Sequence, residues 1–356
     1  MGLIPQRDYF DKDIANSDNT SGYYIIEHND FVYNPRKSSD APYGPISRYA
    51  YPDAGIVSPL YLCFRAKGDV DTNFFEWYFR SSAWHRYIYM TGDSGARHDR
   101  VSIKDDDFFS MPIRFPSSIE QKKIASFLNA IERRISSQQL LVDNLKKYKR
   151  GVMQKVFRNM SAFSPSGFET VRLSDIFKKV YRRNSNGEIK NVITNSAEHG
   201  LIPQRDFFDK DIAVDGNTGN YYVIEYGDFV YNPRKSNTAP YGPFNRYERQ
   251  EKGIISPLYT CLVLKADIEP AYLAWYFKSD AWYRYIYDNG SQGVRHDRVS
   301  MTDDLLMGMP VIIPSKDSQI KIAKLLDCLE KRFQVELSQC EYLKTVREAL
   351  LQQLFI

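Results

Sequence analysis

The chain repeats most of its own sequence at a fixed distance, and this repeat constrains its fold more than any other feature. Residues 2–8 recur as residues 200–206, which is 198 positions later. Residues 31–38 recur at the same distance, and Phe157 corresponds to Phe355, so the register holds without a gap. Self-similarity of this kind predicts two copies of one structural module.

Each copy ends in a long apolar seam with helical spacing. Between residues 118 and 157, apolar side chains recur at steps of three and four, with longer steps at polar residues. The seam positions are Ile124, Leu128, Ile131, Ile135, Val142, Leu145, Val152 and Val156, with Ile322, Leu326, Leu329, Phe333, Cys340, Leu343, Leu350 and Leu354 as their counterparts. A period near 3.5 predicts a coiled-coil helix, and about 35 residues make each helix roughly 50 Å long. Neither helix can bury its seam alone, so we expect the two to pack together.

Polar side chains interrupt both seams at corresponding positions. Gln138 and Lys149 lie on the first seam, and Glu336 and Arg347 lie on the second. Polar residues at such positions lower the stability of a coiled coil but fix its register and orientation. We therefore expect these four side chains to determine how the two helices pair.

The sequence before each seam predicts a module of mixed helices and strands. Residues 23–26, 30–33 and 56–64 are rich in aromatic and β-branched side chains and predict strands. Residues 73–87 predict an amphipathic helix, whose aromatic side chains fit a core better than a base-stacking surface. The predicted fold class is α+β, with two repeated mixed α/β modules and two long coiled-coil helices. The predicted boundaries are 1–117 for the first module, 118–158 for the first helix, 159–315 for the second module and 316–356 for the second helix.

The two copies differ at the front. Residues 161–199 have no counterpart in the first copy, because Met1 stands where His199 stands in the second. This additional segment contains a strand–helix candidate at residues 170–177 and a strand candidate at residues 191–194. We therefore expect the first module to be truncated at its N-terminal side relative to the second.

Bulk properties predict a cytoplasmic protein. No apolar run reaches the roughly 18 residues of a membrane span, and the first residues lack the charged and apolar regions of a secretory signal. The four cysteines, Cys63, Cys261, Cys328 and Cys340, have no metal-ligand spacing, so we expect buried thiols in a reducing compartment. The net charge of +4 says little about partners, because the placement of the arginines matters more.

The sequence carries no recognisable catalytic or cofactor motif. The sequence has no GxxxxGK[ST] phosphate-binding loop and no glycine-rich turn for a dinucleotide or a methyl donor. Residues 33–36 superficially resemble the Asn-Pro-Pro-aromatic motif of amino-methyltransferases, but the second proline and the aromatic residue are missing. We therefore predict no catalytic residue, no metal site and no cofactor in this chain.

Residues 97–100, Arg-His-Asp-Arg, recur as residues 295–298 and invite comparison with an acid–base pair. Neighbouring residues of an extended segment point to opposite sides, so His98 and Asp99 would not naturally pair. No nucleophile motif accompanies them, which makes catalysis the least favoured interpretation. A structural loop held by an Asp–Arg pair and a contact to DNA are the two interpretations that stay open.

A set of cations recurs on predicted loops beside Gly, Pro, Tyr and Asn. Arginine matches phosphate oxygens and the O6/N7 edge of guanine, whereas lysine acts as a point charge toward phosphate. Scattered surface cations are usually only solvated, but a loop position favours a binding face. The predicted DNA-binding residues are Arg7, Arg36, Lys37, Arg48, Arg97, His98 and Arg100 in the first copy, and Arg205, Arg234, Lys235, Arg246, Arg295, His296 and Arg298 in the second.

Several segments give the chain a resemblance to the DNA-specificity (S) subunit of type I restriction–modification enzymes, the HsdS family. They are residues 55–61 with their twin 253–259, residues 121–128, 131–135 and 145–157 of the first predicted helix, and residues 319–329 and 352–355 of the second. The resemblance covers nearly the whole chain. It departs from the family at the front, where the first recognition domain lacks its opening strand and helix.

The resemblance implies two target recognition domains joined by two long antiparallel helices, each domain reading half of a split site in double-stranded DNA. The helices would set the distance between the half-sites and bind the methyltransferase (M) subunits, and restriction (R) subunits would join through that complex. S-adenosylmethionine, ATP and magnesium are expected only in those partner subunits. The chain itself would be a non-catalytic subunit, with no contact to a membrane.

The repeat also bears on the target. Near-identical modules related by an approximate two-fold axis should read near-identical half-sites in inverted orientation, so we predict a near-palindromic target around an unread spacer. The alternative is a coiled-coil protein that only dimerises and binds no specific DNA. The salt dependence of duplex binding would separate the two. A DNA mimic would need a strongly acidic surface, and the net charge of +4 argues against it.

Overall fold

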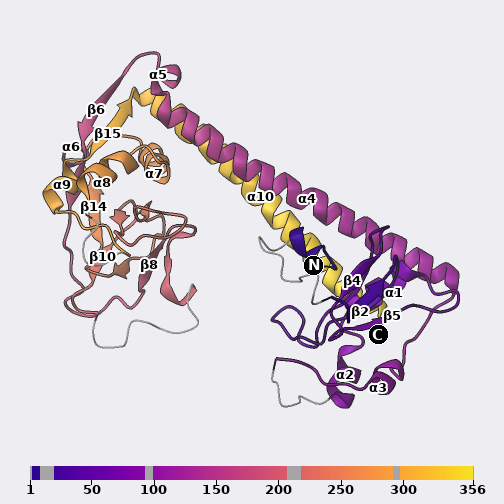
Figure 1. Cartoon of the computed structure of the whole chain (residues 1–356). Helices are drawn as coiled ribbons and strands as arrows, with labels where there is room; N and C mark the ends of the chain where they lie inside the picture. Colours follow the sequence, from indigo (N-terminus) through magenta and orange to yellow (C-terminus); the bar gives the residue numbers. More distant parts are fainter. Residues whose placement is uncertain (1, 9–19, 93–98, 207–217, 292–296, 356) are drawn as a thin grey trace. The chain divides into compact units, whose positions relative to one another are not determined.

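The structure is a computed structural model of the 356-residue chain. It describes residues 2–8, 20–92, 99–206, 218–291 and 297–355. The chain divides into two compact units, Met1–Val142 with Val335–Ile356, and Asp143–Gln334. Each long helix begins in one unit and ends in the other (Figure 1).

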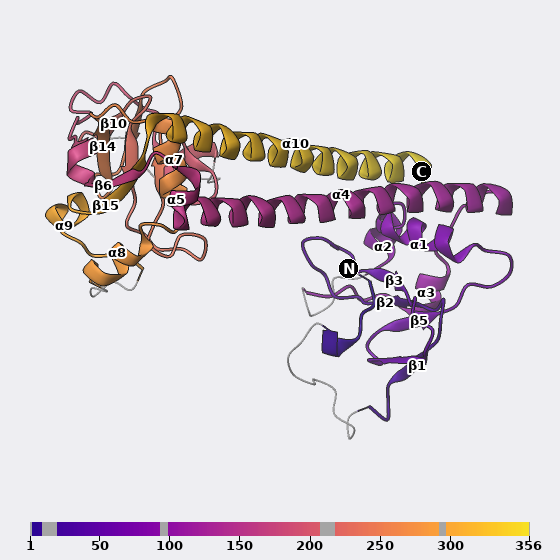
Figure 2. The same ribbon diagram turned by 90° about the horizontal axis from the view of Figure 1, so that it is seen from above.

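The first unit contains a three-stranded antiparallel sheet and a separate two-stranded one. The sheet order is β3 (Ile46–Arg48), β2 (Phe31–Tyr33), β5 (Leu62–Phe64), and the smaller sheet pairs β1 (Tyr24–Ile26) with β4 (Gly55–Val57). The 3-10 helix η1 (Gln6–Asp8) precedes the strands, and α1 (Thr72–Arg80), α2 (His85–Thr91) and α3 (Asp105–Phe109) follow them. Helix α1 lies between the three-stranded sheet and the long helix α4 (Figure 2).

Two predicted elements of this unit are each split in the structure. Residues 56–64 form not one strand but parts of two, because Pro59 lies in a turn between β4 and β5, which belong to different sheets. The predicted helix over residues 73–87 is interrupted at Ser81, whose hydroxyl donates to the Tyr78 carbonyl (2.6 Å) and so ends α1. The prediction that the aromatic side chains form the core is confirmed, since Trp77 and Trp84 are almost fully buried.

The second unit repeats this plan and adds elements to it. Its main sheet has the order β12 (Phe244–Arg246), β11 (Phe229–Tyr231), β14 (Thr260–Leu264), β7 (Phe177–Lys179). Three further strand pairs are β10 (Tyr222–Ile224) with β13 (Gly253–Ile255), β15 (Pro310–Pro314) with β6 (Phe168–Arg172), and β8 (Ile193–Ser196) with β9 (Gly200–Pro203). The helices are α5 (Met160–Phe163), α6 (Leu173–Ile176), η3 (Gln204–Asp206), α7 (Pro270–Lys278), α8 (Tyr283–Asn289) and α9 (Asp303–Met307). All strand pairings within these sheets are antiparallel.

The additional segment of the second copy accounts for the larger sheet. Strand β7 pairs with β14 in the register Leu264↔Phe177, and β6 pairs with β15. Leu173, Ile176 and Phe177 from this segment are buried in the core of the unit. The strand–helix candidate at residues 170–177 is thus confirmed, and it completes the core of the second module.

The two long helices agree with the predicted boundaries to within two residues at each end. They are α4 (Ser118–Arg158) and α10 (Lys316–Leu354), and they run side by side in opposite directions (Figure 1). The fully buried seam residues are Leu128, Ile135, Val142, Val156, Ile322, Leu326 and Cys340. The assignment of Leu354 to the buried seam was wrong, because this residue is 37% exposed, and Leu351 is buried instead.

Two of the four polar seam residues contact each other across the helix pair, and the other two each bind a glutamate of the opposite helix. The Gln138 side-chain amide donates to the Glu336 carboxylate (2.6 Å) and to the Glu336 carbonyl (3.0 Å), and both residues are buried. In the first unit Arg347 donates to the Glu132 carboxylate (3.0 Å). In the second unit Lys149 donates to Glu330 (2.5 Å), the counterpart of Glu132.

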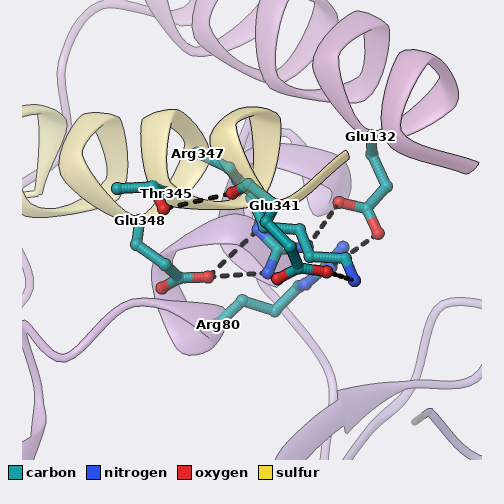
Figure 3. Close-up of polar contacts among 7 residues, drawn as sticks. Arg80, Glu132, Glu341, Thr345, Arg347 and Glu348 are labelled. Atoms are coloured by element: carbon teal, nitrogen blue, oxygen red, sulfur yellow. Dashed lines mark hydrogen bonds and ion pairs between the residues drawn. The ribbon is translucent and has the colours of Figure 1, made fainter. Parts of the chain in front are cut away.

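Glu132 also ties the first module to the helices. Figure 3 shows its carboxylate between Arg347 of α10 and Arg80 of α1, whose guanidinium lies 3.3 Å away. Burial alone would raise the pKa of Glu132, but the hydrogen bond from Arg347 and the charge of Arg80 outweigh it and hold the pKa below its usual value. The carboxylate therefore stays ionised while it links three helices.

The cysteine prediction is only partly right. All four thiols are free, and Cys261 and Cys340 are buried, but Cys63 is half-buried and Cys328 is exposed on α10. Cys328 was expected to be buried, but it lies between the seam residues Leu326 and Leu329 and is exposed. Among the described residues, no helix is both long and apolar enough to cross a membrane.

Candidate nucleic-acid interface

Two distant loops of the first unit are held together by backbone hydrogen bonds. Lys37 N–H donates to the Asp99 carbonyl (2.8 Å), and Val101 N–H donates to the Pro35 carbonyl (2.9 Å). A single antiparallel bridge pairs Arg36 with Arg100. Three predicted site residues, Arg36, Lys37 and Arg100, are therefore brought to one place, which we call the first arginine loop pair.

The local sequence explains how this loop is built. The Asn34 side-chain oxygen accepts a hydrogen bond from Arg36 N–H (3.0 Å), which makes a compact turn around Pro35. Gly44 has φ +81°, and a Cβ atom there would lie 2.1 Å from the Asn34 carbonyl oxygen. Only glycine permits this close approach. Asn34 and Pro35 therefore shape a turn.

The second unit builds the same arrangement from its own copy. Lys235 N–H donates to the Asp297 carbonyl (2.8 Å), and Arg234 is bridged to Arg298. Gly242 has φ +84°, and a Cβ atom there would lie 2.0 Å from the Asn232 carbonyl oxygen. Arg234, Lys235 and Arg298 are the second arginine loop pair, so the sequence repeat is also a repeat of geometry.

The charges of these loops face solvent. Arg36 and Arg234 are exposed, and their Nε atoms lie 3.8 Å from Asp99 and 3.7 Å from Asp297. Exposed ion pairs of this kind are worth only about 0–1 kcal/mol, so the arginines can exchange them for a phosphate. The Asp–Arg pair expected for a structural loop is present. Asp99 pairs with Arg36 of the other loop, whereas Asp297 pairs with Arg234 of the other loop and also, at 3.8 Å, with Arg298 of its own loop.

Tyr259 is a neighbour of the second loop pair that the sequence prediction missed. Burial raises the pKa of its hydroxyl, and the charges of Arg234 and Arg298 act in the opposite direction. Tyr259 also lines a hollow of about 210 Å³ together with Tyr231 and Pro233. Its counterpart Tyr61 lines a hollow of about 580 Å³ in the first unit. The recurrence of Ser-Pro-Leu-Tyr in both copies is the sequence feature that could have identified these two tyrosines.

Other predicted cations lie apart from the loop pairs. Arg48 pairs in the β-ladder with Phe31, at the opposite end of β2 from Arg36, and donates to Glu76 (2.8 Å) and Asn29 (2.9 Å). Its counterpart Arg246 lies over the ring of Tyr226 (5.4 Å) and 3.9 Å from Glu248. Both arginines have partners inside their own module, and a contact to DNA stays a prediction for them.

The remaining predicted residues are distributed differently. Arg205 is exposed on η3, and Arg7 lies on η1, where its side chain is outside the described part. Arg97, His98, Arg295 and His296 also lie outside the described residues. Where the chain is described, no group of three or more His, Cys, Asp and Glu side chains could hold a metal ion.

Comparisons with known proteins give a fold. No protein-family model matches the chain, and no curated protein matches it in sequence. A solved chain from a type I R-M system, studied for complex assembly and conformational transition, matches with a TM-score of 0.59 and 17% identity over 93% of this chain and 82% of that chain. The HsdS subunit from Thermoanaerobacter tengcongensis matches with a TM-score of 0.50 and 17% identity over 93% of this chain and 81% of its own. The chain therefore has the fold of these proteins, with repeated modules and two long helices.

Proposed function

We propose that this chain is the DNA-specificity subunit of a type I restriction–modification system and has no catalytic residues of its own. It reads a bipartite, near-palindromic site in double-stranded DNA for methyltransferase and restriction subunits. The observation that carries the proposal is the duplicated arginine loop pair, present in both units with the same backbone hydrogen bonds. It occurs on a fold that matches a solved HsdS subunit.

The chemistry of the loop pairs fits a duplex. Arginine donates in a planar fork that matches phosphate oxygens and the guanine edge. The Nε atoms of Arg100 and Arg298 are buried and have no hydrogen-bond partner in the described part of the chain. Arg298 Nε also lies 3.8 Å from the Asp297 carboxylate, so these two nitrogens face the protein, and a contact to DNA would come from the other guanidinium nitrogens. Phosphate contacts would fix the position of each module, and contacts to base edges would supply specificity.

The proposal of a near-palindromic site is supported by the contacts between the helices. Gln138 and Glu336 occupy equivalent positions in the two copies, 198 residues apart, and they bind each other directly. The Arg347–Glu132 and Lys149–Glu330 pairs are equivalents of one another. Contacts of equivalent residues with each other are what a local two-fold axis produces at a helix pair. If the two modules followed the same axis, the sequence read by one would be inverted relative to the sequence read by the other.

The coiled-coil alternative is less well supported. A helix that served to dimerise the protein would keep its apolar seam available for another chain. Here the seam residues Leu128, Ile135 and Val142 are buried within the first unit. The outer faces of the long helices instead expose large apolar side chains, at Ile119, Phe127, Leu140, Tyr148, Val335 and Tyr342. We assign these faces to the methyltransferase subunits, which would also bind S-adenosylmethionine; ATP and magnesium would bind in the partner subunits.

The deciding experiment is co-purification with a methyltransferase subunit, followed by mapping of methylated sites in the host genome. We expect methylation at a split site whose halves are nearly inverted repeats. Binding of the purified complex to that duplex should weaken steeply with salt, because cations replace condensed counterions on phosphates. A complex that forms but methylates no split site would contradict the proposal. Two unrelated half-sites would contradict only its near-palindromic part.

The length of the helices provides a second test. Insertion of seven residues into α4 and seven into α10 at equivalent positions lengthens the pair by about 10 Å and preserves the heptad register. We expect the complex to methylate the same half-sites with a longer unread spacer. A matched control inserts the same residues into only one helix, which shifts the Gln138–Glu336 contact out of register and should abolish methylation. An unchanged spacer would refute the role of the helices in setting this distance.

A further inference from the structure

The first unit has an open apolar groove along one side of β5. The groove has a volume of about 640 Å³, and its lining includes Phe64, Phe109, Ile113 and Phe115. Phe109 is 61% exposed and Phe115 is 45% exposed, which is unusual for phenylalanine. In the part of the chain that the structure describes, β5 has β2 as its only strand neighbour, so its other edge is unpaired.

The corresponding place in the second unit is filled. Strand β7 occupies the free edge of β14, and β6 pairs with β15. The counterparts of Ile113 and Phe115 are Val311 and Ile313, and both are buried. Residues 112–116, which would correspond to β15, form no strand in the first unit. Among the described residues, the same surface is therefore covered in one copy and uncovered in the other.

We propose that this groove binds a separate polypeptide segment that resembles residues 168–180 of this chain. The segment would extend the three-stranded sheet by one strand at β5 and insert apolar side chains at the positions of Leu173, Ile176 and Phe177. Addition of a strand to a free sheet edge is a common mode of peptide recognition, in which backbone hydrogen bonds give affinity and side-chain pockets give specificity.

The charges around the groove define the chemistry of the segment further. In the second unit Arg182, just beyond β7, binds the acids Glu225 and Asp228. In the first unit the equivalent acids, Glu27 and Asp30, are already bound by Arg65 of the chain itself. The partner segment therefore needs its apolar side chains and a free backbone, but no arginine at its end.

A second copy of this chain is a poor source of the segment. Its own Leu173, Ile176 and Phe177 are buried in the second module and would have to be pulled out of a core. A free segment carries no such cost. The competing explanation is that aromatic residues seal the groove without a partner, since Phe64 and Phe109 already contact each other edge to face at 6.2 Å.

The test uses the full-length chain and a fluorescein-labelled synthetic peptide with the sequence of residues 168–180. We expect saturable binding in fluorescence anisotropy with one peptide per chain. Hydrogen exchange should then slow at residues 62–66 and 112–116 and stay unchanged at residues 260–264, where the edge is already paired. The matched control peptide carries Leu173→Asp and Phe177→Asp, and should bind more than about tenfold more weakly because its carboxylates would be buried.

A second control changes the groove. Phe115→Glu alters an exposed side chain, so the variant should fold, and it should lose peptide binding. If this variant misfolds, the comparison of the two peptides still decides the question. No binding of the native peptide, equal binding of the control peptide, or slowed exchange only in the second module would each overturn the proposal. DNA binding is not involved in any of these measurements, so their outcome is independent of the proposed function.

Discussion

The two modules are alike where they meet the long helices and unlike at the edge of the sheet. In the first, the Trp77 indole donates to Asn129 of α4 (2.9 Å), and in the second the equivalent Trp275 donates to Asp327 of α10 (2.8 Å). A glutamine near the start of each long helix accepts a backbone N–H from the N-cap residue of a module helix: Gln121 accepts from Asp71 before α1, and Gln319 accepts from Glu269 before α7. The attachment to the helices is thus constant, whereas the sheet edge varies.

The same acid pair is neutralised from two different strands. Arg65, which binds Asp30 at 2.6 Å, extends from the end of β5, whereas Arg182 reaches Asp228 from the segment after β7. The position equivalent to Arg65 in the second copy is Val263, which pairs with β7. Both modules therefore place a guanidinium group beside the acid pair, but the arginine that supplies it stands at a different position in each copy. The two copies show that the acids are the fixed part of this contact.

The largest expected difference between the modules is the stability lost when an aromatic side chain is removed at the sheet edge, which is covered in the second module and open in the first. Phe177→Ala removes a buried ring and should lower local stability of the second module by about 3–5 kcal/mol. Phe115→Ala on the open groove should cost less than about 1 kcal/mol. Hydrogen exchange, followed separately in peptides from each module, measures both.

A matched pair of buried positions controls this comparison. Phe79 and Phe277 are equivalent, and both are almost fully buried against their sheets. Their replacement by alanine should cost about 3–5 kcal/mol in either module. If Phe115→Ala cost as much as Phe177→Ala, the groove would be a packed core and the contrast between the edges would be lost.

The next contrast concerns the two arginines on the acid pair. Arg182→Met should destabilise the second module by about 1–3 kcal/mol, because Asp228 is buried and loses a charged partner. Arg65→Met should cost no more than this: Asp30 is also buried and loses hydrogen bonds of 2.6 and 3.0 Å, but 59% of the Arg65 side chain is exposed and water screens part of the ion pair. Urea unfolding followed by module-specific hydrogen exchange measures both values.

A rescue variant tests whether the origin of the guanidinium matters. Val263→Arg in the Arg182→Met background places an arginine where Arg65 stands in the first copy. We expect it to recover part of the lost stability. No recovery, together with an intact fold, would show that the strand of origin is fixed and that the two ion pairs are not equivalents.

The sequence was sufficient to predict the features that depend on periodicity. The repeat, the ends of α4 and α10, and the polar seam contact of Gln138 with Glu336 all follow from spacing along the chain. The break between α1 and α2 does not, because it depends on how Ser81 and Trp84 cap the preceding helix. The aromatic pattern continues across this break and hides it.

The sequence predicted which cations could bind DNA, but not which of them lie close together in the fold. Arg36 and Arg100 were both named, but the backbone bridge that joins them links segments far apart in the sequence. Arg48 belongs to the same repeated set, and its spacing gives no sign that Glu76 holds it at the other end of the strand. Strand register therefore decides which cations lie close together, and strand register does not follow from the spacing of residues along the chain.

The arginine loop pairs should contribute equally if the modules read similar half-sites. Arg36→Ala and Arg234→Ala should each weaken binding of the complex to its duplex by about 1–2 kcal/mol and lower the salt slope by about one. Lys122→Ala, an exposed cation on α4, is the charge-matched control and should have a smaller effect. Titrations at several salt concentrations measure these values. A large effect from only one of the two arginines would show that the modules bind DNA differently.

The smallest contrast concerns the pH dependence of the two equivalent acids. For Asp30, burial would raise the pKa, but the hydrogen bonds from Arg65 and Glu27 N–H and the charge of Arg65 outweigh it, so the pKa is lowered. For Asp228, burial raises the pKa, and the hydrogen bond from Glu225 N–H and the charge of Arg182 offset only part of this. The stabilising contribution of Asp30 is present above its ordinary pKa and is lost as pH falls through the lowered value. The contribution of Asp228 is present below its ordinary pKa and is lost as pH rises through the raised value.

The two acids should therefore respond to pH with opposite sign. Between about pH 6 and pH 3, the stability of the wild type relative to Asp30→Asn should fall in the first module as the solution is acidified. The stability of the wild type relative to Asp228→Asn should rise in the second module over the same range. Hydrogen exchange, corrected for the intrinsic pH dependence of exchange, measures both slopes in one sample. Slopes of the same sign would mean that Arg182 neutralises its acid as fully as Arg65 does, and that the two edges differ in packing but not in electrostatics.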